Sequence, residues 1–384
     1  MTDIVVIGAG AVGLPSAYYL AQEGMHVALV DKEPAPAQGS FKAAIGGVRA
    51  THSEPAKITL CQDSLRIFST WKETMGTEIG WKKGGYCFPV YRPQDEVLLK
   101  GMLPLQHNYD LKIDWLDADG IKKAVPGINE NGLIGGTLSV DDGQASPLLF
   151  ASSLTEECQK LGVEFRLGEE ARKVLTKGDR VVGVETDKDT IAADYVLNAA
   201  GSRAAPIAAT ANVHVPVTPD SHEAGVTMPI QHFLAPLVVD LRPGPDGKTS
   251  NFYFGQTKDG SVIFCCTPSP TIPSEDRRCT SEFLPRVTRR LLDVIPRFEN
   301  LVVRRLWRGL YHMTPDGSPI VGQAAKVSGF YLAVGLCGQG FMMGPGIAKN
   351  MAHYVATGKT YLEPNPFESL SPERDFNAGK EALT

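Results

Sequence analysis

A glycine-rich turn between two apolar strands, close to the start of the chain, constrains the fold more than any other feature. The residues Ile4 to Ile7 are apolar β-formers, and Gly8-Ala-Gly-Ala-Val-Gly13 follows them directly. A helical stretch and a second apolar strand that ends at Asp31 complete a β-α-β unit. A G-x-G-x-x-G motif in this setting is typical of proteins that bind the pyrophosphate of a dinucleotide.

Each glycine of this turn has a physical task. Gly8 allows the tight turn, Gly10 lets the backbone approach a pyrophosphate, and Gly13 lets the helix pack closely on the strand. Asp31 lies 18 positions after Gly13, where a carboxylate can accept hydrogen bonds from an unphosphorylated ribose. We therefore predict a dinucleotide site, and the unit alone leaves open whether the ligand is FAD or NAD.

The composition excludes several classes of protein. Of the 384 residues, 43% are apolar and 21% are charged, which is an ordinary globular balance, and the length suits two domains that share a core. The net charge of −5 argues against a nucleic-acid partner. The seven cysteines form no C-x-x-C pair, so we expect reduced thiols and no metal site. The first strand begins at Ile4 and no apolar run is long enough to cross a bilayer, which predicts a cytoplasmic protein without a signal peptide or transmembrane segment.

Small residues dominate the stretch from Gly39 to His52, where Lys42 and Arg49 carry the only formal charges. Such a backbone can lie flat against a large planar ligand. Arg49 can bind a carboxylate through two parallel N–H···O bonds, although an arginine on a solvated turn would give the same sequence. Further along, Asn198-Ala-Ala-Gly201 ends a predicted strand and offers a second close approach to a dinucleotide, at Ala200 and Gly201.

The pattern changes to alternating strands between residues 213 and 303, which predicts a mostly antiparallel second domain inserted into the first. Tyr253 in this block either faces a substrate or belongs to the core. The stretch from Trp307 to Gly322 is rich in turn residues, and Phe330 to Val334 is a predicted strand that leads through a glycine turn to a helix over 347–357. We expect the polar tail from Leu362 to Thr384 to be peripheral.

These blocks together resemble the D-amino-acid-oxidase-like family of FAD-dependent oxidoreductases, which includes glycine oxidase and the β subunits of sarcosine oxidase and L-proline dehydrogenase. The matching motifs are GAGAVG…VDKE, GGVR, DDGQASP, LNAAG, MTPDGSPIVG and GQGFMMGPG. The resemblance implies an α/β fold, with a Rossmann-like FAD-binding domain of the glutathione-reductase type over 1–85, 141–210 and 305–384. It implies an inserted substrate-binding β domain over 86–140 and 211–304. The residues that it places around the FAD are Gly8, Gly10, Ala11, Val12, Gly13, Asp31, Lys32, Ser40, Lys42, Ala43, Ala44, Gly47, Ala171, Ala200, Gly201, Gly309, Gly338, Gln339, Gly340, Phe341 and Met342.

The chain departs from the family at several positions. Gly309 stands where sarcosine oxidase-like enzymes attach the flavin to a cysteine, and residues 39–49 contain no histidine that could replace it, so we expect FAD to be non-covalent. Tyr311 stands where glycine and D-amino-acid oxidases place a carboxylate-binding arginine. These departures leave Arg49 as the best carboxylate ligand, with His52, Tyr253 and Tyr311 as its candidate neighbours.

A lysine that lies over the flavin in oxidases of the sarcosine type is also missing. The expected position on the strand from Ser261 to Cys266 falls at Ile263 or Phe264, which are both apolar. This departure favours a dehydrogenase over an oxidase.

The preferred function is an FAD-dependent dehydrogenase that oxidises a small α-amino acid or secondary amine, such as glycine, sarcosine, proline or a D-amino acid. The expected reaction passes a hydride to flavin N5 and gives an imine, which then hydrolyses. One alternative is a 2-hydroxy-acid dehydrogenase, which needs His52 or His312 as a base. Another is a flavin-bearing subunit of a hetero-oligomer, which passes electrons to a partner subunit or a quinone.

Overall fold

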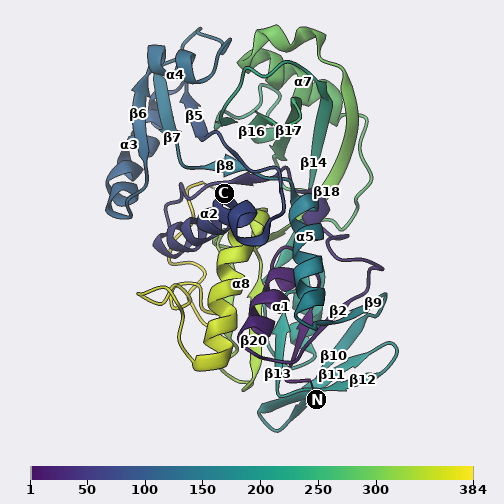
Figure 1. Ribbon diagram of the computed structural model, residues 1–384. Coiled ribbons are helices and arrows are strands. Elements are labelled where there is room, and N and C mark those ends of the chain that lie inside the picture. The colour runs from purple at the N-terminus through teal and green to yellow at the C-terminus, as the bar shows by residue number, and fades with distance from the viewer. Residues whose placement is uncertain (1, 384) are drawn as a thin grey trace.

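The β-α-β unit forms the centre of a six-stranded sheet (Figure 1). The computed structural model describes residues 2–383, and β1 (Ile4–Ile7) pairs in parallel with β2 (Val27–Asp31) and with β13 (Tyr195–Asn198). The strand order is β19-β20-β13-β1-β2-β9, and only β19 is antiparallel to its neighbour. The other strands of this sheet are β9 (Glu164–Leu167), β19 (Ile320–Gln323) and β20 (Phe330–Val334). This mostly parallel sheet confirms the predicted Rossmann-like α/β class.

Side chains of β1 point alternately to two cores, one on each face of the sheet. Ile4 and Val6 pack against helices on one face, and Val5 and Ile7 pack on the other face, next to a three-stranded sheet. The helices of the first face are α1 (Gly13–Gln22), α2 (Pro55–Met75), α5 (Pro147–Lys160) and α8 (Gly340–Thr357). The second face is covered by β10 (Ala171–Lys177), β11 (Arg180–Thr186), β12 (Thr190–Ala192) and α6 (Ala204–Ala209). Both faces are therefore covered, as a parallel sheet requires.

A second, eight-stranded sheet lies at the other end of the molecule (Figure 1). Its order is β18-β14-β17-β16-β15-β5-β7-β6, and all of its pairings are antiparallel except that of β15 with β5. Its strands are β5 (Tyr86–Val90), β6 (Ile113–Asp117), β7 (Gly135–Ser139), β14 (Thr218–Pro229), β15 (Leu237–Asp240), β16 (Thr249–Gln256), β17 (Ser261–Pro268) and β18 (Val303–Met313). The helices α3 (Pro93–Asn108), α4 (Ala118–Ala124) and α7 (Phe283–Val294) belong to this end. The mostly antiparallel sheet agrees with the alternating pattern of the sequence.

The two sheets meet through short elements. A three-stranded sheet is formed by β3 (Gly47–Val48), β8 (Gly143–Gln144) and β4 (Lys82–Lys83). The turn of 3-10 helix at Phe41–Ala43 also lies here, and the indole N–H of Trp307 on β18 donates to the carbonyl of Ala43 at 2.8 Å. These contacts place the Gly39 to His52 segment between the two sheets.

Two expectations for the last third of the chain were wrong. The stretch from Trp307 to Gly322 was expected to be rich in turns. Residues 314–319 do form turns, but the part up to Met313 belongs to β18, because β14 supplies hydrogen-bond partners along its length. The last helix begins at Gly340 and not at residue 347. The glycines in its first turns, which made this part of the sequence look like a loop, are needed because the helix packs closely on neighbouring backbone. At Gly344, for example, an added Cβ would lie 2.0 Å from the carbonyl oxygen of Ala11.

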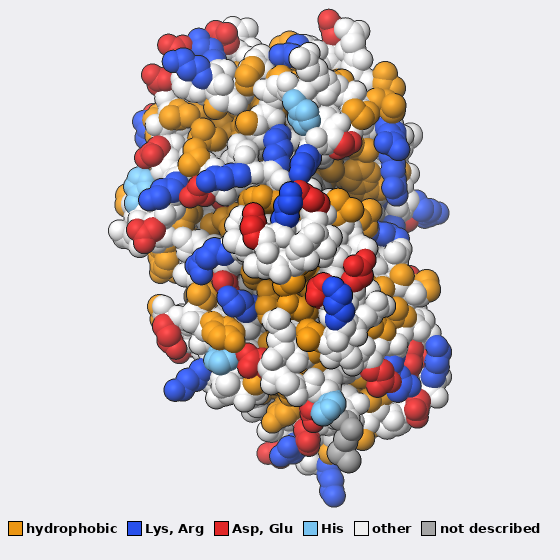
Figure 2. Space-filling model, viewed as in Figure 1, with side chains coloured by type: hydrophobic (Ala, Val, Ile, Leu, Met, Phe, Trp, Pro, Cys, Tyr) orange, Lys and Arg blue, Asp and Glu red, His pale blue; other side chains and the backbone are white. Residues whose placement is uncertain are grey.

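The surface shows no dominant charge on the face drawn in Figure 2, where Lys and Arg side chains are interspersed with Asp and Glu. This agrees with the small net charge of −5. Among residues 2–383, no helix has both the length and the hydrophobicity needed to span a membrane.

Candidate functional site

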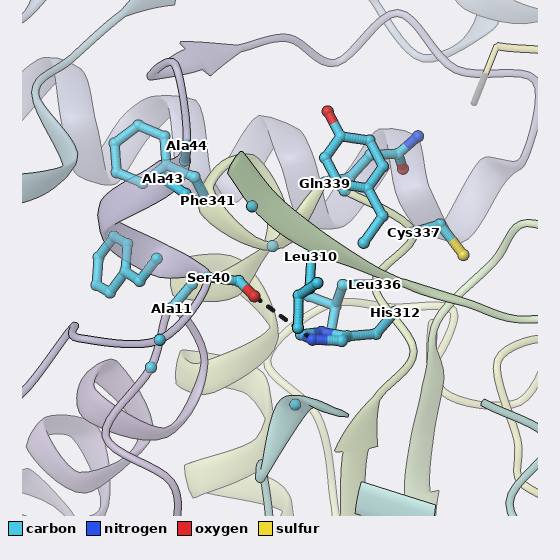
Figure 3. A pocket seen from close by; sticks show the side chains of 18 of the residues that line it. Ala11, Ser40, Ala43, Ala44, Leu310, His312, Leu336, Cys337, Gln339 and Phe341 are labelled. Atoms are coloured by element: carbon cyan, nitrogen blue, oxygen red, sulfur yellow. Dashed lines mark hydrogen bonds between the residues drawn. The ribbon is translucent and has the colours of Figure 1, made fainter. Parts of the chain in front are cut away.

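A large cavity extends from the carboxyl ends of β1 and β2 to the eight-stranded sheet, and Figure 3 shows part of its lining. The carboxyl edge of a parallel sheet is the usual ligand site of this architecture. The N-termini of α1 and α8 both open on the cavity, and β16, β17 and β18 form its opposite wall. Residues far apart in the sequence therefore share one site.

The glycine turn has the geometry that the motif predicts. Gly8 has a φ of +102°, and an added Cβ there would lie 2.5 Å from the carbonyl oxygen of Ala199. An added Cβ at Gly13 would lie 1.8 Å from the carbonyl oxygen of Gly8. At Gly10, in contrast, no atom lies within 4 Å of the added Cβ, so this glycine leaves open space on the cavity side. Among the three glycines of the turn, Gly10 is therefore the one where the space beside the backbone stays open for a ligand.

Asp31 stands at the end of β2 and lines the cavity. Its Oδ2 accepts a hydrogen bond from the backbone N–H of Ala9 at 2.6 Å, and its Oδ1 accepts one from Glu33 at 2.9 Å. Burial raises the pKa of this carboxyl, while the two N–H donors oppose the shift. Because a carboxylate can accept about four hydrogen bonds, Asp31 keeps acceptor capacity for ribose hydroxyls.

Two helix N-termini face the cavity without internal caps. Val12 before α1 and Gln339 before α8 make no side-chain capping bond, and neither helix has an acidic residue in its first turn. Uncapped N–H groups and the positive end of a helix dipole attract anionic or electron-rich groups. Together with the open space at Gly10, this donor set fits the pyrophosphate and flavin ring of FAD.

Most of the residues predicted around FAD line this one cavity. They are Gly8, Gly10, Ala11, Val12, Asp31, Lys32, Ser40, Ala43, Ala44, Gly47, Ala171, Ala200, Gly201, Gly309, Gly338, Gln339, Gly340, Phe341 and Met342. Of the predicted substrate residues, Arg49, Tyr253 and Tyr311 line it as well.

Three predicted residues do not line the cavity. Gly13 packs beneath the glycine turn, which is its structural task. Lys42 is exposed and donates to Gln38 at 2.9 Å. His52 is fully buried behind Arg49, and burial lowers its pKa well below the ordinary value. His52 is therefore a neutral core residue and not a contact for substrate.

Arg49 is a buried arginine that has no carboxylate partner. It is 6% exposed, and its Nη atoms donate to the carbonyl oxygens of Thr51 and, at 2.6 Å, Leu383. Among residues 2–383, no carboxylate oxygen lies within 4.0 Å of its guanidinium. Asp142 lies close enough to interact, but burial raises its pKa to about 7, so it is only partly charged near neutral pH. Arg49 thus opens on the cavity without a carboxylate at ion-pair distance, and its positive charge is only partly balanced by Asp142.

Two tyrosines on the wall of β16 and β18 form a pair. The hydroxyls of Tyr253 and Tyr311 are hydrogen-bonded to each other, and burial raises the pKa of both phenols. The ring of Tyr311 stacks on His222 with centroids 3.7 Å apart, and His222 is held by Asp220 through a 2.9 Å contact at Nε2. An added Cβ at Gly338 would lie 2.1 Å from the Tyr311 ring. The ring of Tyr311 is therefore fixed, and both phenols stay protonated as hydrogen-bond donors.

His312, on β18, also lines the cavity, and its Nε2 lies 3.5 Å from the hydroxyl of Ser40 (Figure 3). Burial, helped by the charge of Arg277, lowers the pKa of His312 to about 4. The imidazole is therefore neutral at physiological pH, and its lowered pKa makes it a weak proton acceptor.

The register of β17 differs from the expected one. The position over the flavin was predicted to be Ile263 or Phe264, but Cys265 and Thr267 are the residues of this strand that line the cavity. Side chains alternate along a strand, so the predicted pair straddled the two faces. The cavity-facing positions still carry no lysine.

The end of the described chain was predicted to be peripheral, and this was wrong. Glu381 is buried in an ion pair with Lys57 at 3.2 Å, and Leu383 lines the cavity with its carbonyl on Arg49. Nothing in the local sequence pattern of the tail indicates this contact, because its partners lie more than 300 residues away.

We expect the FAD to be released intact when the protein is denatured. An added Cβ at Gly309 would lie 2.7 Å from that of Ala43, so no attachment residue fits there. The two cavity thiols, Cys265 and Cys337, have pKa values raised by burial, which leaves them protonated and poorly nucleophilic. Acid precipitation should leave the flavin in the supernatant, and flavin fluorescence on the denatured polypeptide would contradict this.

Comparison with known proteins supports the same kind of site. The sequence profile of a family described as "FAD dependent oxidoreductase" matches residues 3–354. The 4-methylaminobutanoate oxidase (formaldehyde-forming) of Paenarthrobacter nicotinovorans is 26% identical over 92% of this chain and 43% of its own length. The sarcosine oxidase subunit beta of Rhodobacter capsulatus is 23% identical over 94% of this chain and 86% of its own length. The chain spans about half the length of several curated relatives.

Among solved structures, L-proline dehydrogenase from P. horikoshii superposes with a TM-score of 0.90 at 28% identity, over 99% of both chains. The likeness therefore extends over both sheets and over the cavity between them.

Proposed function

Because this chain belongs to the family of FAD-dependent oxidoreductases, we propose that it is a dehydrogenase for a small α-amino acid or secondary amine. The proposal is supported by relatives that are named as oxidoreductases of amino acids or amines, such as sarcosine oxidase subunit beta and L-proline dehydrogenase. FAD, when bound, supplies the acceptor for the two electrons and the hydrogen of the substrate. The protein's own residues bind the substrate and fix its orientation.

The single observation that carries this proposal is the state of Arg49. A buried charge without a counter-ion is costly, and here the unpaired guanidinium opens on a cavity. A substrate carboxylate would provide the missing negative charge and match the planar donors of arginine. An α-amino acid bound in this way has its reacting Cα one bond from the anchored carboxylate.

The neighbouring side chains suit the rest of such a substrate. One of the Tyr253 and Tyr311 hydroxyls donates to the other, which leaves the pair one O–H that can donate to a polar group of the substrate. Ile45, Tyr86 and Phe88 supply an apolar wall that excludes water.

The test of the proposed function is anaerobic mixing of the holoenzyme with amino acids, amines and hydroxy acids while flavin absorbance is recorded. Bleaching by small amino acids is the expected result, and no bleaching by any of them would reject the proposal.

A 2-hydroxy acid is the second candidate, and His312 favours it. The alcohol proton must leave during oxidation, and His312 is a histidine in the cavity with an unprotonated ring nitrogen toward which that proton could move, although its lowered pKa makes it a weak base. Bleaching of the flavin by hydroxy acids but not by amino acids would show that the protein is a 2-hydroxy-acid dehydrogenase.

We expect reduced flavin to react slowly with O₂. Superoxide formation needs positive charge near the flavin, and β17 supplies none, because it presents only the uncharged Cys265 and Thr267. In the proposed function, the charge of Arg49, on the other side of the cavity, is paired with the substrate carboxylate. The electrons would then pass to a partner subunit or a quinone. Stopped-flow reoxidation in air-saturated buffer should be slower than reoxidation by an artificial acceptor. Reoxidation by O₂ at the rate of turnover would make the protein an oxidase.

A further inference from the structure

The segment Glu381–Leu383 is anchored inside the protein. The Glu381 carboxylate accepts hydrogen bonds from the backbone N–H and the hydroxyl of Ser53 at 3.0 and 2.8 Å. It also forms the 3.2 Å ion pair with Lys57, and neither side chain of this pair is exposed. The backbone N–H of Ala382 donates to the Ser53 hydroxyl at 2.9 Å. These contacts hold the segment against the start of α2.

The electrostatics of this anchor keep it charged. Burial alone would raise the pKa of Glu381, but the neighbouring His52 and Lys57 and the backbone N–H groups of Ser53 and Leu383 outweigh burial and lower it. Burial lowers the pKa of Lys57, and Glu381 opposes that shift. A buried ion pair of this kind is costly to break, since one charge would remain without a partner. The segment Glu381–Leu383 is therefore held in one position, where it forms part of the cavity wall.

Leu383 brings this wall to Arg49. Its carbonyl oxygen accepts hydrogen bonds from Arg49 Nη2 at 2.6 Å and from Gln339 Nε2 at 3.3 Å. Its side chain is 4% exposed and packs in one apolar cluster with Tyr86 and Phe88, which also line the cavity. The isobutyl group therefore occupies space directly beside the guanidinium.

We propose that Leu383 limits the size of the substrate side chain that fits beside Arg49, and that Glu381 holds Leu383 in that position. This inference rests on the proposed function, because it takes Arg49 as the carboxylate ligand. Once a carboxylate is fixed on Arg49, the substituent on the next carbon has to share the apolar cluster with Leu383. A larger substituent meets the isobutyl group, which the anchored backbone prevents from moving aside.

The test compares Leu383→Ala with the parent holoenzyme. We would measure calorimetric binding of straight-chain carboxylates from acetate to hexanoate, and anaerobic flavin reduction by amino acids of increasing side-chain length. Leu383→Ala should shift the preference toward the longer ligands by about tenfold or more, the effect of hydrocarbon that does or does not fit a pocket. Leu362→Ala is the matched control, because Leu362 packs on the other core and does not line the cavity. An unchanged preference in a folded Leu383→Ala holoenzyme would overturn the proposal.

Glu381→Gln provides a second variant that keeps the side-chain shape. Loss of the carboxylate charge frees the segment, so the same shift toward longer ligands is expected, accompanied by normal FAD content. Retention of the parent's size preference would overturn the anchoring role of Glu381.

Alkylamines without a carboxylate separate this inference from the proposed function. If the parent binds no carboxylate but Leu383→Ala shifts the preference within an alkylamine series, carboxylate recognition by Arg49 is rejected and the size limit stands. If the parent binds carboxylates and neither series shifts, the size limit is rejected and carboxylate recognition stands.

Discussion

Arg49→Met is expected to weaken binding of the carboxylate substrate by roughly 30- to 5,000-fold, which corresponds to the loss of about 2–5 kcal/mol when one partner of a buried charge pair is truncated. The guanidinium has no carboxylate partner within the described residues, so a substrate carboxylate would be its first counter-ion. Flavin reduction by amino acids should become unsaturable, while the FAD content stays normal. Rapid-mixing reduction over a range of substrate concentrations measures the effect.

Arg49→Lys separates charge from geometry. Lysine keeps the positive charge but loses the planar two-pronged match to a carboxylate, so reduction should still be slower and less saturable than in the parent. Arg277→Lys is the matched control, because Arg277 lines the same cavity and is exposed. Unchanged kinetics in Arg49→Lys would move carboxylate recognition to Tyr311.

Asp31→Ala is expected to weaken FAD binding by roughly 10- to 150-fold, since a hydrogen bond to a charged group contributes about 1.5–3 kcal/mol. The variant removes the acceptor for the ribose hydroxyls and also releases the N–H groups of Ala9 and Glu33. Fluorescence titration of the FAD-free protein measures the affinity.

Two comparisons isolate the ribose contact. Asp31→Asn keeps the side-chain shape and should give a smaller loss than Asp31→Ala. The melting temperature of the FAD-free variant reports the cost of the released backbone donors by itself. FAD affinity equal to that of the parent in Asp31→Ala would show that another group holds the ribose.

The parts of the site that could be predicted are those in which local sequence determines geometry. In the turn from Gly8 to Gly13, backbone atoms come so close to Gly8 and Gly13 that a side chain larger than a hydrogen atom would clash, as the added-Cβ distances show. Arg49 was recognisable because it is one of only two charges in a stretch of small residues. The residue limits of the two domains and the individual roles of the site residues stay predictions.

The parts that could not be predicted depend on distant partners. Trp307 to Met313 adjoins the turn residues that follow Met313, and its pairing with β14 is what makes it part of a strand. On β17 the face that meets the cavity depends on its register with β16, in which Tyr253 pairs with Cys265. Leu383 reaches Arg49 across 334 positions of sequence, and no periodicity of the tail encodes that contact.

The two uncapped helices that face the cavity begin at Gly13 and Gly340, so the first and last thirds of the polypeptide each supply one half of the cofactor cradle. During translation the part of the cradle at Gly13 leaves the ribosome long before the part at Gly340. Strand β1 also lacks its neighbour β13 until residue 198 has left the ribosome. The FAD-binding site of a nascent chain is therefore incomplete until α8 has been synthesised. Because a ligand stabilises only the state that binds it, this cofactor can protect the finished polypeptide from unfolding and proteolysis, but it gives no such protection to a truncated one.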